Sequence, residues 1–340
     1  MRKKVLLTKG INYLPGAEEA LKKEVEVVVS PGATEKEIMP LLRDINAIIA
    51  PDTNITEAII QAAPLLQAIS TPQVGYDKIN VAAATKFGVP VIASVGLTAN
   101  AVAEFTVGLM IGLARRIPRS DRDLREKKNW SARALYANPA QEMGIDFKGS
   151  TVGLIGLGFI GSSVARICKA AFSCRVLAYD PFVSKEIMAA QGIEKREDII
   201  SLAREADFVS LHMSLTNETR HVINETVLHA MKNSAFLVNC ARGPVVDEKA
   251  LVKALQEKWI AGAATDVYEE EPINPENPLL NLPNVIVTPH IGGVTVGSSI
   301  IRGQEMVKRI LDVFSGKKPE GLINPDVWPA YIKRFNSIGK

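Results

Sequence analysis

The sequence lacks most of the features that mark exported, membrane-bound or nucleic-acid-binding proteins. It has only three cysteines, without the spacing of a metal site, which argues against a disulfide framework and is typical of a reducing compartment. The longest apolar run, residues 101–114, is interrupted by Glu104 and is shorter than a bilayer span. The 40 basic and 37 acidic residues are mixed along the chain and leave a net charge of only +3, without a cationic block for nucleic acid or anionic lipid. These absences, and an amino terminus with too few apolar residues for a secretory signal, predict a cytoplasmic protein that spans no membrane and binds no nucleic acid.

What the sequence does have is an alternation of short apolar runs with amphipathic segments, which predicts helix-covered parallel sheets. The first series of strand candidates lies at residues 5–7, 25–29, 47–50, 66–70 and 89–92. The second lies at residues 151–155, 175–179, 208–211, 235–239, 262–265 and 285–287. Six strands are the size of a complete dinucleotide-binding sheet, and 340 residues are enough for two domains. The change of composition near Pro118 suggests a domain boundary there.

A glycine-rich loop follows the first strand of the second series. It reads Gly156-Leu157-Gly158-Phe159-Ile160-Gly161. In the dinucleotide fingerprint the first glycine allows a tight turn, the second lets the backbone approach pyrophosphate, and the third lets helix pack on strand. The glycines alone are weak evidence, but a strand precedes this loop and a helical pattern follows it. We therefore expect a pyrophosphate at the start of that helix.

Asp180 ends the next strand, about twenty residues further on, where the fingerprint expects an acid. Its carboxylate would accept hydrogen bonds from the adenosine ribose and repel a 2′-phosphate. Pro181 and Phe182 offer no cation, and Lys185 is the nearest basic residue. The expected cofactor is therefore NAD rather than NADP.

Three further polar residues follow strands of the second series. Arg242, Glu271 and His290 come after the strands at 235–239, 262–265 and 285–287. Ligands of doubly wound sheets bind beyond the carboxyl ends of the strands, so these side chains would meet at one crevice. Taken singly, Arg242 and Glu271 also fit a surface ion pair, and His290 fits an ordinary loop histidine. The other three histidines, His212, His221 and His229, lack such a setting and are interpreted as structural.

Together the three residue types predict hydride-transfer chemistry on a 2-oxo acid. The Arg242 guanidinium can hold a carboxylate bidentately. His290 can protonate the oxygen at C2 as hydride arrives, and it can act as the general base in the oxidation direction. Glu271 would orient His290 and favour its charged form.

At this point the sequence resembles the D-2-hydroxyacid dehydrogenase family, which includes phosphoglycerate, lactate, glycerate and glyoxylate-reducing enzymes, over essentially the whole chain. The resemblance is carried by the glycine loop with Asp180 and by three motifs. These are Asn239-x-x-Arg242-Gly243, Asp266-Val267-Tyr268-x-x-Glu271-Pro272 and Pro289-His290-Ile291-Gly292-Gly293. The activity implied is hydride transfer between NAD(H) and C2 of a small D-2-hydroxy or 2-oxo acid such as glyoxylate or hydroxypyruvate.

The resemblance also implies an architecture and a set of ligand contacts. The fold is α/β with two doubly wound parallel-sheet domains. A Rossmann domain of residues 100–293, which binds NAD, is inserted in a flavodoxin-like substrate-binding domain of residues 1–99 and 294–340. Catalytic roles fall to Arg242, Glu271 and His290, and substrate contacts to Val74, Gly75, Arg242 and His290. Cofactor contacts fall to Gly156, Gly158, Phe159, Ile160, Gly161, Asp180, Ala241, Asp266, His290 and Gly292. A polar arm, about 118–148 with Trp130, would embrace a partner in a homodimer.

Two departures and three rival functions qualify the resemblance. Ser214 stands where many relatives have proline beside the cofactor, and the loop 50–53 offers Asp52 where phosphoglycerate-type relatives carry arginines, which disfavours a phosphorylated substrate. The alternatives are a phosphoglycerate dehydrogenase, a phosphite dehydrogenase and an NAD-sensing, corepressor-like binding protein. Glu271 argues against a formate dehydrogenase, in which a glutamine accompanies the histidine.

Overall fold

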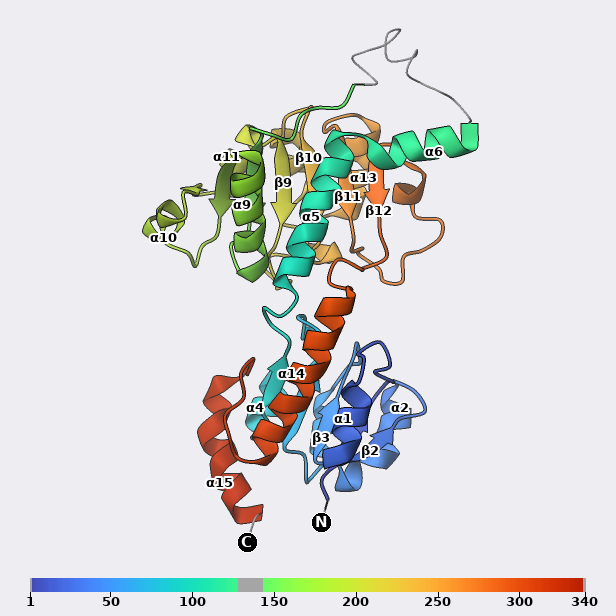
Figure 1. Ribbon diagram of the computed structural model, residues 1–340, viewed down its shortest axis with the longest axis vertical. Helices are drawn as coiled ribbons and strands as arrows, with labels where there is room; N and C mark the ends of the chain where they lie inside the picture. Colours follow the sequence, from blue (N-terminus) through green and yellow to red (C-terminus); the bar gives the residue numbers. More distant parts are fainter. Residues whose placement is uncertain (1, 128–142, 339–340) are drawn as a thin grey trace. The chain divides into compact units, whose positions relative to one another are not determined.

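The computed structural model describes residues 2–127 and 143–338 (Figure 1). The chain divides into two compact units, one made of Met1–Thr98 with Val294–Lys340 and the other of Ala99–Gly293. The domain boundary that the composition suggests near Pro118 is wrong, because the helices on both sides of Arg116 belong to the second unit. Trp130 and the middle of the predicted arm lie outside the described residues.

The first unit contains a five-stranded sheet of order β2-β1-β3-β4-β5, in which every pair is parallel. This is the flavodoxin-like order. The strands are β1 (Lys4–Leu7), β2 (Glu26–Val29), β3 (Ala47–Ile49), β4 (Ala68–Thr71) and β5 (Val91–Ala93). The apolar residues of β1, β3, β4 and β5 are buried on both faces, as a helix-covered parallel sheet requires, whereas the edge strand β2 is only partly covered.

Helices cover both faces of this sheet, and one of them comes from the carboxyl-terminal part of the chain. Helix α14 (Val296–Phe314) buries Met306, Val307, Ile310 and Val313 in the same core as residues of β1 and β3. It packs against α1 (Ala17–Glu24). The remaining helices are α2 (Glu35–Ile38), α3 (Glu57–Gln61), α4 (Val81–Lys86) and α15 (Trp328–Ile338), with 3-10 turns η1 (Met39–Asp44) and η4 (Pro325–Val327).

The second unit contains a larger sheet of order β12-β11-β10-β9-β6-β7-β8, again parallel throughout. Its strands are β6 (Thr151–Ile155), β7 (Arg175–Tyr179), β8 (Glu194–Lys195), β9 (Phe208–Leu211), β10 (Phe236–Asn239), β11 (Gly262–Thr265) and β12 (Val285–Val287). The order reverses between β6 and β9, as in the Rossmann fold, and the predicted fold class is confirmed. The structure has seven strands rather than the six expected. The additional one is the two-residue edge strand β8, which could not be predicted because it contains no apolar run.

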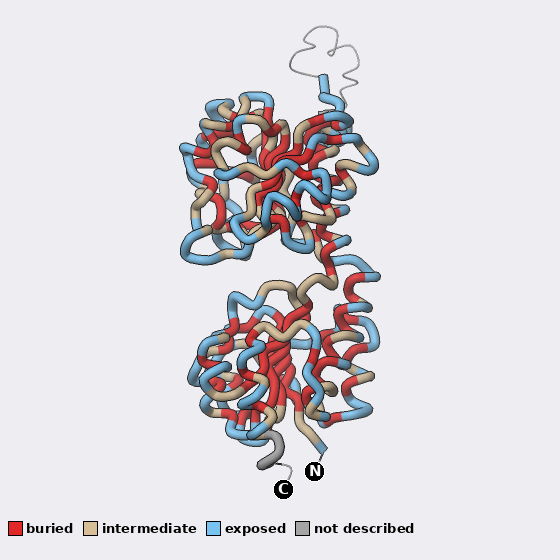
Figure 2. Tube along the Cα trace, turned by 90° about the vertical axis from the view of Figure 1, so that its left-hand side faces the viewer, coloured by how far each residue is buried: buried red, intermediate tan, exposed pale blue. Residues whose placement is uncertain are grey.

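Two apolar cores lie on either side of this sheet, and the strands form the buried centre of the unit in Figure 2. Helix α5 (Ala99–Ala114) packs against α9 (Phe159–Phe172) and over β10 and β11. The other helices are α6 (Ile117–Lys127), α10 (Lys185–Ala190), α11 (Ile199–Glu205), α12 (Glu225–Ala230) and α13 (Glu248–Gln256), with η2 (Gly243–Val245) and η3 (Pro278–Asn281). Because all seven strands are parallel, their carboxyl ends lie at one edge of this sheet.

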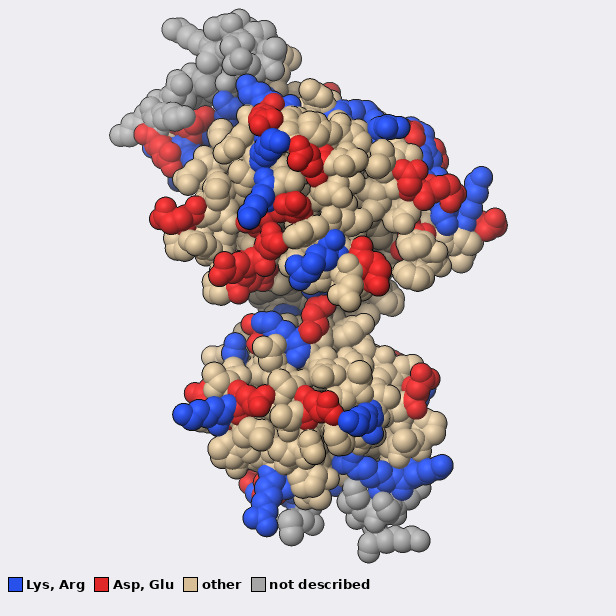
Figure 3. All heavy atoms as spheres, turned by 180° about the vertical axis from the view of Figure 1, so that it is seen from behind, with Lys and Arg blue, Asp and Glu red and all other residues tan. Residues whose placement is uncertain are grey.

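The face of the molecule seen in Figure 3 carries charges of both signs. Lys and Arg side chains alternate with Asp and Glu over the visible face of each unit in Figure 3. Among the described helices none is long and apolar enough to cross a membrane, and the described residues contain no group of three or more side chains placed to hold a metal ion.

Candidate active site

The glycine loop joins β6 to α9 at the carboxyl edge of the larger sheet. Gly156 has a φ of 95°, and a Cβ atom there would lie 2.8 Å from the backbone of His212. A Cβ on Gly161 would lie 2.3 Å from the carbonyl oxygen of Gly156. Gly158, in contrast, has no atom within 4 Å of its would-be Cβ. Packing within the protein therefore requires the first and third glycines, whereas the second leaves open space of the kind that a close-lying phosphate needs.

The same loop leaves backbone donors at the start of a helix. Helix α9 begins at Phe159, and the amides of its first turn, including that of Ile160, have no acceptor within a regular helix. Together with the dipole of a 14-residue helix, they favour an anionic group. The loop thus fits the pyrophosphate of a dinucleotide.

Asp180 directly follows β7 and fixes this loop. Its carboxylate accepts hydrogen bonds from the backbone N–H groups of Leu157 and Phe182, each at 2.8 Å. An ionised carboxylate has about four acceptor sites, so capacity is left for the hydroxyls of a ribose. Asp180 therefore lies beside the glycine loop, where it can also accept from a bound ligand.

Arg242 follows β10, and its backbone is held by local hydrogen bonds. The Asn239 side chain accepts from the N–H of Ala241 at 3.0 Å and donates to the carbonyl oxygen of Arg242 at 2.9 Å. A Cβ on Gly243 would lie 1.7 Å from the carbonyl oxygen of Tyr268, so only glycine fits at the next position. The loop after β10 is thereby packed closely onto the loop after β11.

Glu271 and His290 come from the loops after β11 and β12 and form a hydrogen-bonded pair. The Nδ1 atom of His290 lies 2.8 Å from Oε2 of Glu271, and because an ionised carboxylate only accepts, Nδ1 is the donor. The other oxygen of Glu271 accepts from the N–H of Tyr268 at 3.0 Å. With Nδ1 so engaged, Nε2 is the ring nitrogen that can exchange a proton with a ligand.

The electrostatics of this pair suit a proton donor near neutral pH. The hydrogen bond to Glu271 raises the pKa of His290, against the opposing effect of burial and with further support from the charges of Glu271 and Asp266. Burial alone would raise the pKa of Glu271, but the His290 hydrogen bond and charge, the Tyr268 amide and the Arg242 charge hold it below its usual value. Arg242 acts on both groups, so the three predicted catalytic residues share one electrostatic environment.

Asp266, the first residue after β11, holds the loop that carries His290 through hydrogen bonds to its carboxylate. It is only 2% exposed. Its carboxylate accepts from the Thr288 hydroxyl at 2.7 Å and from the N–H groups of Ile291 at 2.9 Å and Gly292 at 2.7 Å. These bonds hold His290 at a positive φ of 55°, a conformation that L-residues adopt only when their surroundings enforce it.

Tyr268 is a positioning residue that we did not predict from the sequence. Its hydroxyl donates to the carbonyl oxygen of Thr288 at 2.9 Å, and its N–H donates to Glu271. It therefore ties the loops after β11 and β12 together. The sequence feature that could have indicated this role is its position two residues after Asp266, in the loop that follows β11.

The other histidines differ from His290 in setting. His212, after β9, bonds to the Ser210 hydroxyl at 3.0 Å, and burial lowers its pKa to about 3, which leaves it neutral. His221 pairs with Glu269 at 2.7 Å in an exposed position, and His229 stacks on Trp259. All three have structural partners.

The predicted substrate contacts Val74 and Gly75 lie in the other unit. They follow β4, which ends at Thr71, and so they lie at the carboxyl edge of the smaller sheet, half-buried.

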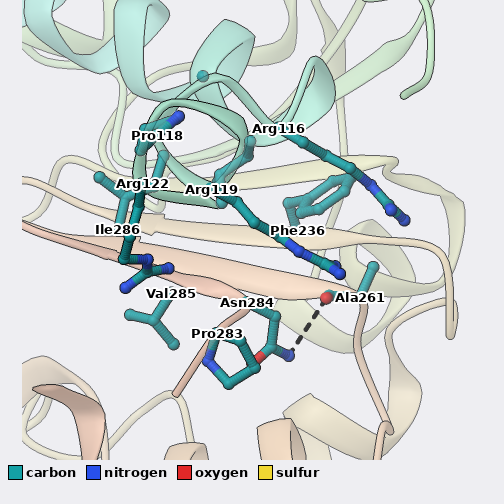
Figure 4. A pocket seen from close by; sticks show the side chains of 12 residues that line it. Arg116, Pro118, Arg119, Arg122, Phe236, Ala261, Pro283, Asn284, Val285 and Ile286 are labelled. Atoms are coloured by element: carbon teal, nitrogen blue, oxygen red, sulfur yellow. Dashed lines mark hydrogen bonds between the residues drawn. The ribbon is translucent and has the colours of Figure 1, made fainter. Parts of the chain in front are cut away.

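A separate cavity of about 120 Å³ lies at the amino edge of the larger sheet (Figure 4). Arg116, Arg119 and Arg122 lie over its floor, which is formed by Phe236 and the residues around Asn284. The site residues of the unit are all at the opposite ends of the strands, so this cavity is not part of the candidate active site.

A Rossmann sheet with a glycine loop, an acid after the second strand and an Arg, Glu and His set at the carboxyl edge defines a dinucleotide-dependent oxidoreductase as a class. Comparison with known proteins gives the family. Residues 107–292 match the NAD-binding domain of D-isomer specific 2-hydroxyacid dehydrogenases. The chain belongs to this family, and its cofactor is a nicotinamide dinucleotide.

Individual relatives cover most of the chain. A glyoxylate reductase from Thermofilum pendens is 39% identical over 86% of this chain and 86% of its own length. A D-3-phosphoglycerate dehydrogenase from Methanocaldococcus jannaschii is 39% identical over 91% of this chain, which spans only 58% of that protein. The solved structure of an NADPH-dependent glyoxylate/hydroxypyruvate reductase from Sinorhizobium meliloti, in complex with NADP and malonate, superposes with a TM-score of 0.83 at 28% identity, over 95% of this chain and 97% of that one.

Proposed function

We propose that the protein reduces small 2-oxo acids, such as glyoxylate or hydroxypyruvate, to D-2-hydroxy acids with NADH. The observation that carries the proposal is the His290–Glu271 pair in the electrostatic reach of Arg242, at the edge where the glycine loop also lies. Reduction of a 2-oxo acid needs a proton donor beside the oxygen on C2 and a cation beside the C1 carboxylate. The imidazolium of His290 and the guanidinium of Arg242 are groups of these two kinds. The relatives named as glyoxylate reductases support the same substrate class.

Each residue has a role that follows from its contacts. A bound nicotinamide supplies or accepts the hydride. Arg242 binds the substrate carboxylate through its planar, two-pronged guanidinium, and so it fixes the face that C2 presents. His290, protonated, donates the Nε2 proton to the oxygen at C2 as negative charge develops there, and takes it back in the oxidation direction.

Glu271 acts through His290. It fixes the tautomer by accepting from Nδ1, and its charge keeps the imidazolium populated. Asp266 and Tyr268 act one step further away, because they hold the two loops that carry Glu271 and His290. We propose in addition that Asp266 faces the nicotinamide carboxamide, and that Ala241 and Gly292 complete the cofactor contacts.

We propose NAD rather than NADP as the physiological cofactor. Asp180 places a carboxylate beside the glycine loop, where it would repel a 2′-phosphate. The smaller unit would bind the substrate through the amides of Val74 and Gly75, and this assigns residues 1–99 and 294–340 as the substrate-binding domain.

A homodimer is the proposed assembly. Helix α6 and the segment 143–145 expose Ile117, Leu124, Met143 and Ile145, all at least 41% accessible. Apolar side chains gathered on one arm favour a protein partner. Size-exclusion chromatography with light scattering tests this, and a monomer at micromolar concentration contradicts it. The three free cysteines support a cytoplasmic location, which fractionation would test.

The function is tested by measuring NADH oxidation, with NADPH in parallel, over glyoxylate, hydroxypyruvate, pyruvate, phenylpyruvate and 2-oxoisocaproate. Saturable turnover with NADH and an unreactive His290→Ala variant is the expected result. Equal background turnover by the wild type and the variant on every substrate, with NADH still bound, would favour an NAD-sensing protein instead.

A further inference from the structure

The smaller unit buries an arginine for which the protein provides almost no partner. Arg302 lies on α14 and is only 7% exposed. Its Nη2 donates to the Ser299 hydroxyl at 3.3 Å, and its Nε is buried with no hydrogen-bond acceptor. No described carboxylate forms a salt bridge with it. A guanidinium has five N–H donors, so most of its capacity is unused within the described residues.

A second arginine on the same helix shows what structural burial of a guanidinium looks like. Arg309 is 4% exposed, and its Nε donates to the Glu305 carboxylate at 3.2 Å while its Nη1 donates to the carbonyl oxygen of Ala93 at 2.9 Å. Burying a charge costs free energy unless hydrogen bonds or ion pairs such as these offset the loss of hydration. Arg302 lacks such partners within the described residues, which points to an anion that is not part of the protein.

The surroundings of Arg302 lie at the carboxyl edge of the smaller sheet. The next residue, Gly303, packs against Leu14 and Ala17, which follow the loop after β1. Tyr13 of that loop interacts electrostatically with Arg302, and burial together with the charge of Asp52, which follows β3, raises the pKa of Tyr13. This is the edge at which ligands of doubly wound sheets bind.

At the same edge Asp52 is paired with lysines and is not a bare negative charge. Its carboxylate lies 2.6 Å from the Lys78 ammonium and 3.9 Å from that of Lys9. Glu35 lines the same hollow as Asp52 and Lys78, so this edge carries charges of both signs. The sequence-based argument against a phosphorylated substrate depended on Asp52 being a bare negative charge, and in the structure it is neutralised.

We propose that Arg302 binds a second anionic group, a carboxylate or a phosphate, on the C2 substituent of the 2-oxo acid. The proposal rests on the proposed function and makes it more specific, because acidic 2-oxo acids become better substrates than neutral ones of the same size. Arg302 determines this specificity and takes no part in proton or hydride transfer.

The test compares matched substrate pairs in the wild type and in Arg302→Met, which keeps an unbranched side chain and removes the charge. One pair is 2-oxoglutarate with 2-oxopentanoate, and the other is phosphohydroxypyruvate with hydroxypyruvate. In the wild type we expect kcat/KM to be about 10- to 100-fold higher for the acidic member of at least one pair, as one or two charged hydrogen bonds imply. In Arg302→Met this ratio falls towards 1. The pair that responds distinguishes carboxylate from phosphate.

Lys308→Met is the matched control, because it removes an exposed cation from the same helix. Its ratios should equal those of the wild type. Ratios in Arg302→Met equal to those of the wild type, or a wild type that prefers the neutral member of both pairs, would overturn the proposal while leaving the reductase function intact.

A binding measurement, which needs no turnover, separates failure of the Arg302 proposal from failure of the proposed reductase function. Inorganic phosphate or succinate should raise the melting temperature of the wild type more than that of Arg302→Met, and equal shifts contradict an anion site. Without ligand, Arg302→Met should melt at or above the temperature of the wild type, because a buried charge without a protein partner is lost. Melting well below the wild type would show that Arg302 holds the fold, and would overturn the proposal.

Discussion

The carboxyl edges of the two sheets are built differently. In the larger unit the site side chains are bonded to one another or to nearby backbone: Asp266 accepts three hydrogen bonds, and Glu271 bonds both His290 and the Tyr268 amide. In the smaller unit Arg302 has one long bond to a hydroxyl. A site for an invariant cofactor and a fixed proton transfer profits from preorganisation. The edge we assign to the substrate keeps unmet donors, and that is where specificity can be set.

The comparison is tested most strongly by removing the proton donor of the preorganised edge. His290→Ala should lower kcat by about 10²- to 10⁴-fold, the usual contribution of a general acid, and should leave NADH affinity nearly unchanged. Steady-state kinetics with fluorescence titration of NADH measures both. His221→Ala is the matched control, since it removes a histidine that is also paired with a glutamate at 2.7 Å. Comparable losses in the two variants would disprove the role of His290.

Removing the partner of His290 should have the next largest effect. Glu271→Gln is expected to lower the rate of reduction about 10- to 100-fold, the usual effect of losing an orienting carboxylate. The protonated His290 is the active form for reduction, and Glu271 raises its pKa. Without that carboxylate the decline of activity with rising pH must begin at lower pH. Glu269→Gln controls for loss of a nearby charge, and an unshifted pH profile in Glu271→Gln would contradict the assigned role.

The glycine loop allows packing and ligand contact to be separated. Gly158→Ala should not change the melting temperature, because its Cβ would meet no protein atom within 4 Å. NADH affinity should nevertheless fall about 10-fold, since the methyl group would occupy space meant for pyrophosphate. Gly297→Ala, another open position, should change neither quantity. Normal NADH affinity in Gly158→Ala would place the pyrophosphate elsewhere.

The smallest expected effect concerns the choice between the two dinucleotides. Asp180→Asn removes the charge but keeps an acceptor for the Phe182 amide. Loss of a solvent-screened repulsion of about 1 kcal/mol should reduce the preference for NADH over NADPH about 5-fold. Dissociation constants for both cofactors measure this. An unchanged ratio would mean that the 2′ position is read by another residue.

Much of this fold was predictable from the sequence, because buried parallel strands carry strong local signals. All eleven predicted strands exist, and their ends agree to within two residues. The edge strand β8 gave no signal, since two polar residues pair with only one neighbour. The boundary near Pro118 failed for another reason: helix α5 is apolar on most of its surface, and only the tertiary structure shows that it packs on β10 and β11.

The candidate site was predictable where a polar residue directly follows a strand, as with Arg242 and His290. It was not predictable where the contribution is a contact between loops. Tyr268 joins two loops through its amide and hydroxyl, and the three bonds by which Asp266 holds the His290 loop are likewise visible only in the structure. Arg302 could not be recognised either, because a lone arginine in an amphipathic helix usually faces solvent, and only its burial makes it unusual.

The return of the chain to its first sheet has a consequence for protein synthesis. The core that joins β1 and β3 to α14 needs Met306, Ile310 and Val313, which the ribosome adds only after the whole of Ala99–Gly293. At roughly 5–20 residues per second, those intervening residues take about 10–40 s to make. During that interval the first five strands lack one of their covering helices, and the larger unit has all of its own residues when the interval ends, before α14 is made. The unit that begins the polypeptide is therefore the last to be completed, and its apolar strands wait for α14 until nearly the end of synthesis.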